Sequence, residues 1–536
     1  MNANNLLLSC LVPAIAVGAS FDVRDLGAKG DGTAKDTQSI QTAIDRASAA
    51  GGTVVFPPGS YLSGTLHLRS GVTLWIEKGA KLVFSPDDGD FDAYEALPDR
   101  PQPQTGNPRP LPANATPAEM RMRAAPPAWD DTETSYAHYA LLSGDGVHNV
   151  SIEGPGEIDG NRVRRGGPKP IAFRNSEWIA IRGITVRNAP NYNISLIATD
   201  HVEVEGVRLI DGYADGIDPD NCQFVRITNC YIDAADDAIC PKASMAAGRP
   251  PRGTSHLVVA NCITRTSANH FKFGTESEGN LRNVSVANCV MLSRENGHRA
   301  RSGISIESVD GAHVDGVVVS NLSMEDAMAP IFIRLGVRGR GMDKPVPGTL
   351  ENILIRNVTA KGASIASSIT GSSMARVQDV TIDGFASTGA GGSGARDLDV
   401  PELPDKYPSG DMFGDLPALG LYGRHVDGLR LQDIKIHAVK PDERPALVFD
   451  DVARLELSGF DSTNAPSHQP VVLFRDVAGA LLFGNRLSSA AEIFLSVLGG
   501  RSQGIALRGN DLRLARQEIR KASDAPANAV STDSVR

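Results

Sequence analysis

Short segments in which apolar and polar residues alternate recur along most of the chain. Clear examples are residues 201–207 (HVEVEGV), 224–230 (FVRITNC), 257–262 (LVVANC) and 283–289 (NVSVANC). A two-residue period is that of a β-strand, whose successive side chains point to opposite faces. The stretches between these segments read as turns and loops, without the apolar spacing of a helix. We therefore expect many short strands and an all-β protein.

The distance between neighbouring segments indicates how the strands are arranged. The last residues of the four segments, Val207, Cys230, Cys262 and Cys289, are separated by 23, 32 and 27 residues. A repeat that varies in this way is typical of a solenoid whose coils carry loops of unequal length. Strands that follow one another without intervening helices favour a parallel β-helix over a sheet of alternating strands and helices.

An Asn-Cys pair ends three consecutive segments, at residues 229–230, 261–262 and 288–289. Pairs at one position of successive coils predict stacked side-chain ladders with a spacing of about 4.8 Å. The cysteines lack the short fixed spacing of a metal site. Buried free thiols are therefore favoured over a disulfide or a metal role.

The chain divides into five expected regions. Residues 1–19 contain an apolar stretch followed by small residues, which predicts a signal peptide, with a buried N-terminal segment as the alternative. Residues 20–95 are expected to form an N-terminal cap with a short helix starting at Asp36 or Thr37, and then the first coils. A Pro-rich insertion (96–130), the parallel β-helix (131–516) and a disordered tail (517–536) complete the chain.

Two further interruptions of the strand pattern lie at residues 337–350 and 390–416. Long insertions on one face of a solenoid often build its binding cleft. After residue 19 no apolar stretch approaches the ~20 residues that cross a bilayer. We expect a secreted or periplasmic monomer without a membrane partner.

The charge balance narrows the class of partner. The formal net charge is −10, and no run of Lys and Arg is visible, which argues against nucleic acid. A local basic cleft would still allow an anionic polysaccharide as substrate. We expect neither a cofactor nor a metal.

The most informative polar residues are three carboxyl groups on neighbouring coils. Counting from the segment ends aligns Asp215, Asp237 and Asn269 in one column, with Asp236 beside Asp237. Carboxyl groups this close repel one another, so the pKa of at least one should rise. A protonated acid beside ionised carboxylates is the arrangement that glycoside hydrolysis requires. Turn residues that accept backbone hydrogen bonds, or a calcium site, are the alternatives.

Residues 21–84, 214–222 (ADGIDPDNC) and 235–240 (ADDAIC) resemble glycoside hydrolase family 28, the polygalacturonase family, over roughly residues 20–340. The resemblance implies a right-handed parallel β-helix and hydrolysis with inversion at the anomeric centre. It also implies that Asp236 is the general acid, while Asp215 and Asp237 hold the attacking water. The implied substrate is a pectin-like chain that contains galacturonate or rhamnogalacturonan.

The chain departs from the family pattern at two places. Asn269 stands where the family has a histidine, and His270 follows it, pointing either to the site or away from it. Residues 305–307 (SIE) replace the family's Arg-Ile-Lys, so Glu307 stands where a cation is expected. Lys242, Lys272 and Arg334 are candidates to restore positive charge, with structural ion pairs as the alternative. We therefore expect substrate binding by Asn269, His270, Lys272, Glu307, Arg334 and Lys242.

Two other functional classes stay open. A polysaccharide lyase would use a similar solenoid and release unsaturated products. A non-catalytic glycan-binding β-helix would need no acid and would release no product.

Overall fold

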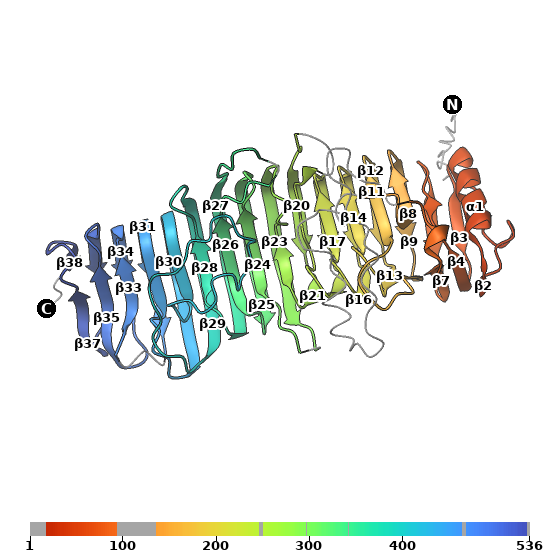
Figure 1. Ribbon diagram of the computed structural model, residues 1–536. Helices are drawn as coiled ribbons and strands as arrows, with labels where there is room; N and C mark the ends of the chain where they lie inside the picture. Colours follow the sequence, from red (N-terminus) through yellow and green to blue (C-terminus); the bar gives the residue numbers. More distant parts are fainter. Residues whose placement is uncertain are drawn as a thin grey trace, which may run out of the picture.

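The structure is a computed structural model that describes residues 18–93, 136–245, 250–295, 297–340, 342–463 and 468–532. The chain winds into one elongated solenoid, with the N-terminal region at one end and the C-terminal region at the other (Figure 1). Three parallel sheets run along its length. The fold is a right-handed parallel β-helix, as expected.

Each sheet collects a strand from most coils, so that strands one coil apart are hydrogen-bonded in parallel; between β17 and β22 one coil joins sheet 1 only through parallel bridges at Ile239. Sheet 1 contains β5 (Leu66–His67), β8 (Ala140–Asp145), β11 (Lys169–Arg174), β14 (Ile194–Ile197), β17 (Ile217–Asp220), β22 (Asn269–Lys272), β24 (Ser302–Ser308), β26 (Ala329–Leu335), β28 (Ser367–Thr370), β33 (Pro470–Arg475), β35 (Ala491–Leu498) and β37 (Ala515–Lys521). Sheet 2 contains β1 (Ser20–Asp22), β3 (Thr53–Phe56), β6 (Thr73–Ile76), β9 (His148–Glu153), β12 (Glu177–Arg182), β15 (Asp200–Glu205), β18 (Gln223–Thr228), β20 (Thr254–Ala260), β34 (Ala478–Phe483), β36 (Gln503–Arg508) and β38 (Val530–Thr532).

Sheet 3 contains β2 (Asp31–Lys35), β4 (Gly59–Ser63), β7 (Ala80–Phe84), β10 (Glu157–Asp159), β13 (Thr185–Arg187), β16 (Arg208–Gly212), β19 (Tyr231–Ala234), β21 (Ile263–Thr266) and β32 (Asp461–Ser462). Longer strands turn the corner from sheet 2 into sheet 3: β23 (Leu281–Ser293), β25 (His313–Glu325), β27 (Thr349–Ala363) and β29 (Val377–Gly391). Strand β30 (Leu421–Lys440) runs through all three sheets, and β31 (Leu447–Ser458) through the first two.

The corner between sheets 2 and 3 is set by asparagine. Asn229, Asn261 and Asn288 adopt left-handed backbone angles, with φ between 56° and 58°, which asparagine tolerates better than most residues. Their side-chain amides donate to one another along the solenoid, at 3.3 Å between neighbouring coils. The predicted asparagine ladder is thus confirmed. The five cysteines in the described residues are free and buried, as the pattern indicated.

The N-terminal end of the solenoid is covered by helix α1 (Thr37–Ala50), which starts where the sequence predicted. Its buried face, formed by Ile40, Ala43, Ile44 and Ala47, packs on the first coil. The helix ends at Gly51, whose φ of 63° suits a residue without a side chain. A short 3₁₀ turn, η1 (Asp88–Asp90), follows β7. The predicted signal peptide (apart from residues 18 and 19) and the Pro-rich insertion lie outside the described residues.

The prediction of a disordered tail from residue 517 is wrong for most of that segment. Strand β37 continues to Lys521, and β38 pairs with β36 in sheet 2. Ala529 is buried, so this segment adds the last incomplete coil. The composition of the tail is polar, but backbone pairing with the preceding coil orders it without a large apolar contribution.

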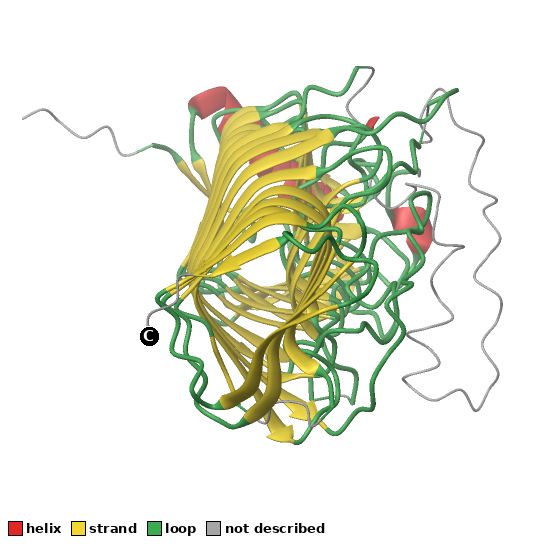
Figure 2. Cartoon of the chain, turned by 90° about the vertical axis from the view of Figure 1, so that its left-hand side faces the viewer, coloured by secondary structure: helices red, strands yellow, loops and turns green. Residues whose placement is uncertain are grey.

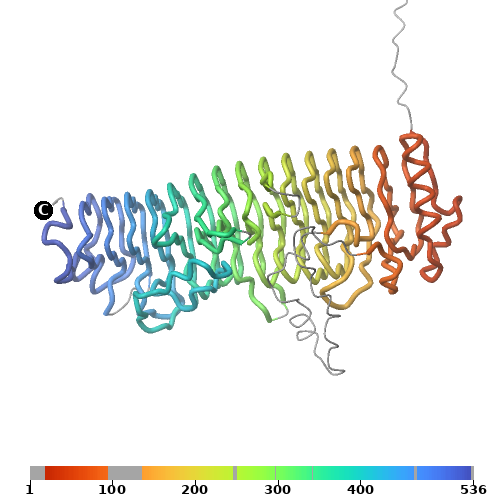
Figure 3. Tube along the Cα trace, turned by 45° about the horizontal axis from the view of Figure 1, so that its top comes forward, coloured from red at the N-terminus to blue at the C-terminus, as the bar shows by residue number. Residues whose placement is uncertain are grey.

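Loops gather on one side of the solenoid when it is viewed along its axis (Figure 2). Residues 392–420, between β29 and β30, form a large projection from the coils, drawn in cyan to blue in Figure 3. This loop contacts sheet 1, because Arg334 of β26 donates to the backbone carbonyls of Glu402 and Leu403. The described residues contain no helix that is long and apolar enough to span a membrane.

Candidate active site

The three predicted carboxyl groups lie on two successive coils of sheet 1. Asp215 immediately precedes Gly216 and β17, and Asp237 occupies the same position one coil later, since the Gly216 amide donates to the Asp237 carbonyl at 2.9 Å. On the third coil the Ala238 amide donates to the Asn269 carbonyl at 2.8 Å. The predicted column of Asp215, Asp237 and Asn269 is confirmed.

Asn269 fixes the orientation of the Asp237 carboxylate. Its backbone amide and its side-chain amide both donate to Asp237 Oδ1, at 3.1 and 2.6 Å. The Ser302 hydroxyl of β24 in turn donates to Asn269 Oδ1. Asn269 therefore contributes to the site by holding an acid rather than by replacing a histidine's acid–base chemistry.

Lys242 is the cation at the centre of the first two coils. Its ammonium lies 3.3 Å from Asp215 Oδ2, 3.8 Å from Asp218 Oδ1 and 3.9 Å from Glu276 Oε2. It also donates to the Tyr192 hydroxyl at 3.0 Å. Burial alone would lower the pKa of Lys242, but the surrounding carboxylates, Asp218 first, raise it well above its ordinary value. This lysine is a fixed internal cation.

Lys272 has the corresponding role on the next coil. Its ammonium lies 3.2 Å from Asp237 Oδ2 and donates to the Tyr407 hydroxyl at 2.9 Å. Burial lowers its pKa, whereas Asp237 and its other neighbours raise it, and the net pKa lies well above the usual range. We call Asp215, Asp218, Asp236, Asp237, Lys242 and Lys272 the carboxylate cluster.

Two acids of the carboxylate cluster are buried so deeply that the neutral form is favoured. Burial is the largest cause that raises the pKa of Asp215 well above its ordinary value, followed by the charge of Asp218. Burial likewise raises the pKa of Asp218 to about 7. Among the described residues neither carboxyl oxygen of Asp218 has a hydrogen-bond partner. The expectation that at least one pKa would rise is confirmed, for Asp215.

Asp236 differs from its neighbours in exposure and in charge. Its side chain is 34% exposed, whereas those of Asp215 and Asp237 are both 6% exposed. Although partial burial raises the pKa of Asp236, the Arg165 guanidinium bound to Oδ2 lowers it to about 2. The acid that the family resemblance assigns as proton donor is therefore ionised while Arg165 is bound.

Glu307 and Arg334 lie on β24 and β26, next to each other in sheet 1. Glu307 is buried, accepts from Ser305 at 2.5 Å and has its pKa raised to about 7, chiefly by burial. Arg334 donates to the backbone carbonyls of Gly371, Glu402 and Leu403. These bonds occupy both terminal nitrogens of the guanidinium, which corrects the expectation that Arg334 grips the substrate.

His270 points into the solenoid. Its ring is fully buried, Nδ1 lies 2.8 Å from the Thr264 hydroxyl, and burial lowers the pKa to about 3. Strict alternation along β22 would place His270 on the face of Lys272, two residues later, but the contact with Thr264 places its ring in the interior instead. The expectation that His270 binds substrate is wrong for this geometry.

Sequence reasoning missed Arg165 and Tyr407. Arg165 follows β10 in a loop before β11, and Tyr407 comes from residues 392–420, more than a hundred residues after the lysine that it contacts. Neither residue lies in a repeated segment, so strand periodicity cannot predict which coil its side chain reaches. The insertions themselves were the only indication that residues outside the coils reach the site.

A metal site in this region would be formed by Asp215, Asp237 and Cys240, whose potential ligand atoms lie within 4.8 Å of one another. Two features oppose it chemically. Burial raises the pKa of the Cys240 thiol well above its usual range, which disfavours the thiolate that binds metals. The ammonium groups of Lys242 and Lys272 lie 3.3 and 3.2 Å from Asp215 and Asp237, so a divalent cation between these acids would meet two fixed positive charges. The donor set therefore fits internal ion pairs better than a divalent cation.

Comparison with known proteins identifies the family to which the chain is similar. The profile of Glycosyl hydrolases family 28 matches residues 119–402, and that of Rhamnogalacturonase A/epimerase, pectate lyase-like, matches residues 20–76. The chain is 26% identical over 377 residues to a Vitis vinifera protein described as "Probable polygalacturonase", which covers 66% of this chain and 71% of that one. It is 24% identical over 441 residues to the exo-poly-alpha-D-galacturonosidase of Dickeya chrysanthemi, covering 75% and 72%.

Among solved structures, the family 28 exopolygalacturonase of Yersinia enterocolitica superimposes with a TM-score of 0.56 at 18% identity. The match covers 86% of this chain and 78% of that structure, and it shows a shared fold. The family 28 profile spans more than half of the chain and includes all three predicted carboxyl groups. The chain therefore belongs to glycosyl hydrolases family 28 and is a glycoside hydrolase.

Proposed function

We propose that the protein hydrolyses glycosidic bonds in a pectic polysaccharide that contains galacturonate, with inversion at the anomeric centre. The observation that carries this proposal is the pairing of two buried carboxyl groups, Asp215 and Asp237, beside a more exposed one, Asp236. Inversion requires one group to protonate the leaving oxygen and another to take a proton from water. The relatives named for galacturonan cleavage support the substrate class.

In the proposed mechanism Asp237 is the general base. Its carboxylate accepts a hydrogen bond from the Asn269 side-chain amide at 2.6 Å and lies 3.2 Å from the Lys272 ammonium. A water molecule between Asp215 and Asp237 gives its proton to Asp237 as its oxygen bonds to the anomeric carbon. Asp215, kept neutral by burial, orients that water. The glycosidic bond breaks, and its oxygen leaves with a proton.

Asp236 supplies that proton in our proposal, because it is the most exposed of the three carboxyl groups. For this step the ion pair with Arg165 has to open when substrate binds, since a carboxyl with a pKa of about 2 carries no proton near neutral pH. The raised pKa of Asp215 makes that residue the second candidate for the donor.

A substrate with an activated leaving group separates these two assignments. Such a group departs without protonation, so an acid-deficient variant regains most of its rate on it, whereas a base-deficient variant does not. We expect this recovery for Asp236→Asn and not for Asp237→Asn. Recovery by Asp215→Asn instead would move the acid role to Asp215.

The class of reaction is tested on a panel of homogalacturonan, rhamnogalacturonan and neutral glycans. We expect new reducing ends from a galacturonate-containing chain, and their loss in Asp237→Asn. Unsaturated products that absorb ultraviolet light would identify a lyase. Binding without any product, unchanged in Asp236→Asn, would identify a glycan-binding solenoid.

We also propose that the protein acts outside the cytoplasm, as a monomer. The apolar stretch of residues 6–17 and the small residues after it support export. The size of a polymeric substrate supports it as well, because polysaccharides of this kind are met outside the cell. Detection of the mature chain in a secreted or periplasmic fraction tests this proposal.

A further inference from the structure

The loop formed by residues 392–420 reaches from the C-terminal half of the solenoid back to the carboxylate cluster. Its Tyr407 accepts a hydrogen bond from the Lys272 ammonium at 2.9 Å, and the same ammonium lies 5.0 Å from the centre of the tyrosine ring. Lys272 itself lies on β22 and is buried against Asp237. One side chain of the loop thus contacts the cation that holds the proposed base.

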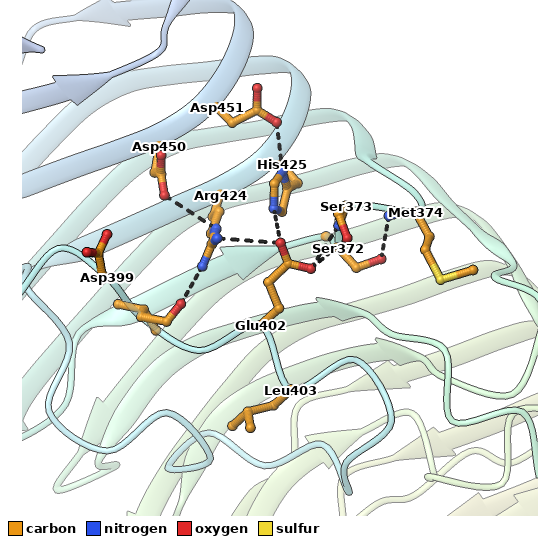
Figure 4. Close-up of polar contacts among 12 residues, drawn as sticks. Ser372, Ser373, Met374, Asp399, Glu402, Leu403, Arg424, His425, Asp450 and Asp451 are labelled. Carbon is orange, nitrogen blue, oxygen red and sulfur yellow. Dashed lines mark hydrogen bonds and ion pairs between the residues drawn. The ribbon is translucent and has the colours of Figure 1, made fainter. Parts of the chain in front are cut away.

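The loop is fixed to sheet 1 through Glu402, five residues before Tyr407 (Figure 4). One carboxylate oxygen of Glu402 accepts from the amide and the hydroxyl of Ser373, at 3.0 and 2.9 Å. The other lies 3.0 Å from His425 Nε2 and 3.4 Å from Arg424 Nη2. The opposite ring nitrogen of His425 lies 2.7 Å from Asp451 Oδ2, so the imidazole bridges two carboxylates.

Further contacts fix the loop on both sides of Glu402. Arg475 of β33 binds Asp399 at 2.6 Å and also binds Asp450. Arg424 donates to the Val400 carbonyl, and the Val337 amide donates to the Pro404 carbonyl at 2.7 Å. We call Asp399, Glu402, Arg424, His425, Asp450 and Asp451 the anchor cluster.

Apolar packing adds to these polar contacts. Leu416, Ala418, Tyr422 and Val448 form a small buried cluster, and Leu398 and Val400 of the loop pack against it. Long loops without regular structure normally retain conformational freedom, which packing and bonding of this extent removes. The loop is thus held in a fixed position against the solenoid, with Tyr407 beside the carboxylate cluster.

We propose that Tyr407 is a positioning residue for hydrolysis, which holds Lys272 on the Asp237 carboxylate, and that the anchor cluster fixes the loop so that Tyr407 reaches it. The inference rests on the proposed role of Asp237 as the base. Lys272 has a long flexible side chain, and two fixed partners restrict its ammonium more than one does. Without the tyrosine hydroxyl, the Lys272 ammonium can move away from Asp237, and a carboxylate that loses a nearby cation is easier to protonate.

Tyr407→Phe tests the contact between Tyr407 and Lys272, because it removes the hydroxyl that accepts from the lysine and keeps the ring. We expect kcat to fall about 10- to 150-fold, the size of effect given by one lost hydrogen bond to a charged group. The acidic limb of the pH profile of kcat/KM should move to higher pH. A merely structural tyrosine would leave that limb in place.

Glu402→Gln tests the anchoring of the loop, since the Glu402 carboxylate binds Ser373, Arg424 and His425 rather than Lys272. We expect a loss of the same kind, and no additional loss when Glu402→Gln is combined with Tyr407→Phe, because both changes act through one contact. Asp405→Asn is the matched control: this exposed loop acid pairs with Lys406 only at the surface, and its change should leave kcat and the pH profile unaltered.

The outcomes separate the inference from the proposed function. Full activity and an unshifted acidic limb in Tyr407→Phe would overturn the inference, while loss of activity in Asp237→Asn would still support the proposed function. Fully additive losses in the double variant would overturn the coupling between anchor and tyrosine. If Glu402→Gln does not fold, the pH profile of Tyr407→Phe decides alone. Activity in Asp237→Asn equal to the wild type would sink the proposed function itself.

Discussion

The carboxylate cluster lies on sheet 1 and the anchor cluster joins that sheet to the 392–420 loop; both combine acids with basic side chains, yet burial affects their acids differently. In the carboxylate cluster, burial raises the pKa of Asp215 and Asp218, and both Asp218 oxygens lack a hydrogen-bond partner among the described residues. In the anchor cluster, partial burial raises the pKa of Glu402, but hydrogen bonds from Ser373 and His425 lower it to about 2.

The two clusters differ in how many hydrogen-bond donors surround their carboxyl groups. The anchor cluster surrounds each acid with hydrogen-bond donors, which stabilises the ionised form and the fold. The carboxylate cluster leaves acids buried with too few donors, which costs stability and retains protons that a reaction can use. The proposed catalytic cluster is thus distinguished by two acids whose pKa is raised chiefly by burial, Asp215 and Asp218.

The largest expected effect comes from the proposed base. Asp237→Asn should lower kcat by about 10²- to 10⁴-fold, because proton transfer to a positioned group typically contributes about that much. The fold should remain, since the amide keeps the shape of the carboxyl group. Reducing-end assays with thermal unfolding as control measure both, and a loss smaller than tenfold would remove Asp237 from the mechanism.

Arg165 offers the next effect, on the pH profile. Arg165→Gln removes the guanidinium that lowers the pKa of Asp236, so this pKa rises. If Asp236 is the acid, activity falls as pH rises through its pKa, and the basic limb of kcat/KM should move up by about one pH unit. An unmoved limb would assign the proton donor to another residue.

Much of this architecture follows from the sequence alone, for a physical reason. Coil position is read from strand periodicity, and residues one coil apart must stack, which placed Asp215, Asp237 and Asn269 in one column. Positions set by loops carry no such constraint: Arg165 and Tyr407 reach the site through non-repeating segments. His270 shows the third case, because the pattern located its coil but not the face to which it points.

The anchor cluster should respond to acid. Glu402 has a lowered pKa in the folded state, so it contributes stability above its unfolded value of about 4.3, and that contribution is lost as pH falls toward 2. Glu402→Gln should lower Tm by about 1–3 °C at pH 7, with no difference near pH 2. An equal difference at both pH values would show that the effect is not electrostatic.

Asp218 should affect thermal stability in the opposite direction. Its folded pKa of about 7 lies above the unfolded value, so ionisation of the unfolded chain destabilises the fold as pH rises from about 4 to 7. Asp218→Asn should therefore raise Tm by about 1–3 °C at pH 7 and leave it unchanged near pH 4. A lowered Tm at pH 7 would mean that Lys242 depends on the Asp218 charge.

The smallest effect on catalysis is expected at His270. Because its ring faces the interior, His270→Gln should leave KM within about twofold and act only on thermal stability. Thermal unfolding curves and steady-state kinetics on the same preparation separate the two quantities. A KM raised tenfold at unchanged stability would return His270 to the substrate site.

The central claim is that a water held by Asp215 and Asp237 attacks the anomeric carbon directly. The most direct test is proton NMR of the first-formed product during cleavage of an α-linked galacturonate oligomer. The account predicts that the β-anomer appears first and then mutarotates. Initial release of the α-anomer, which requires a covalent intermediate, would contradict it.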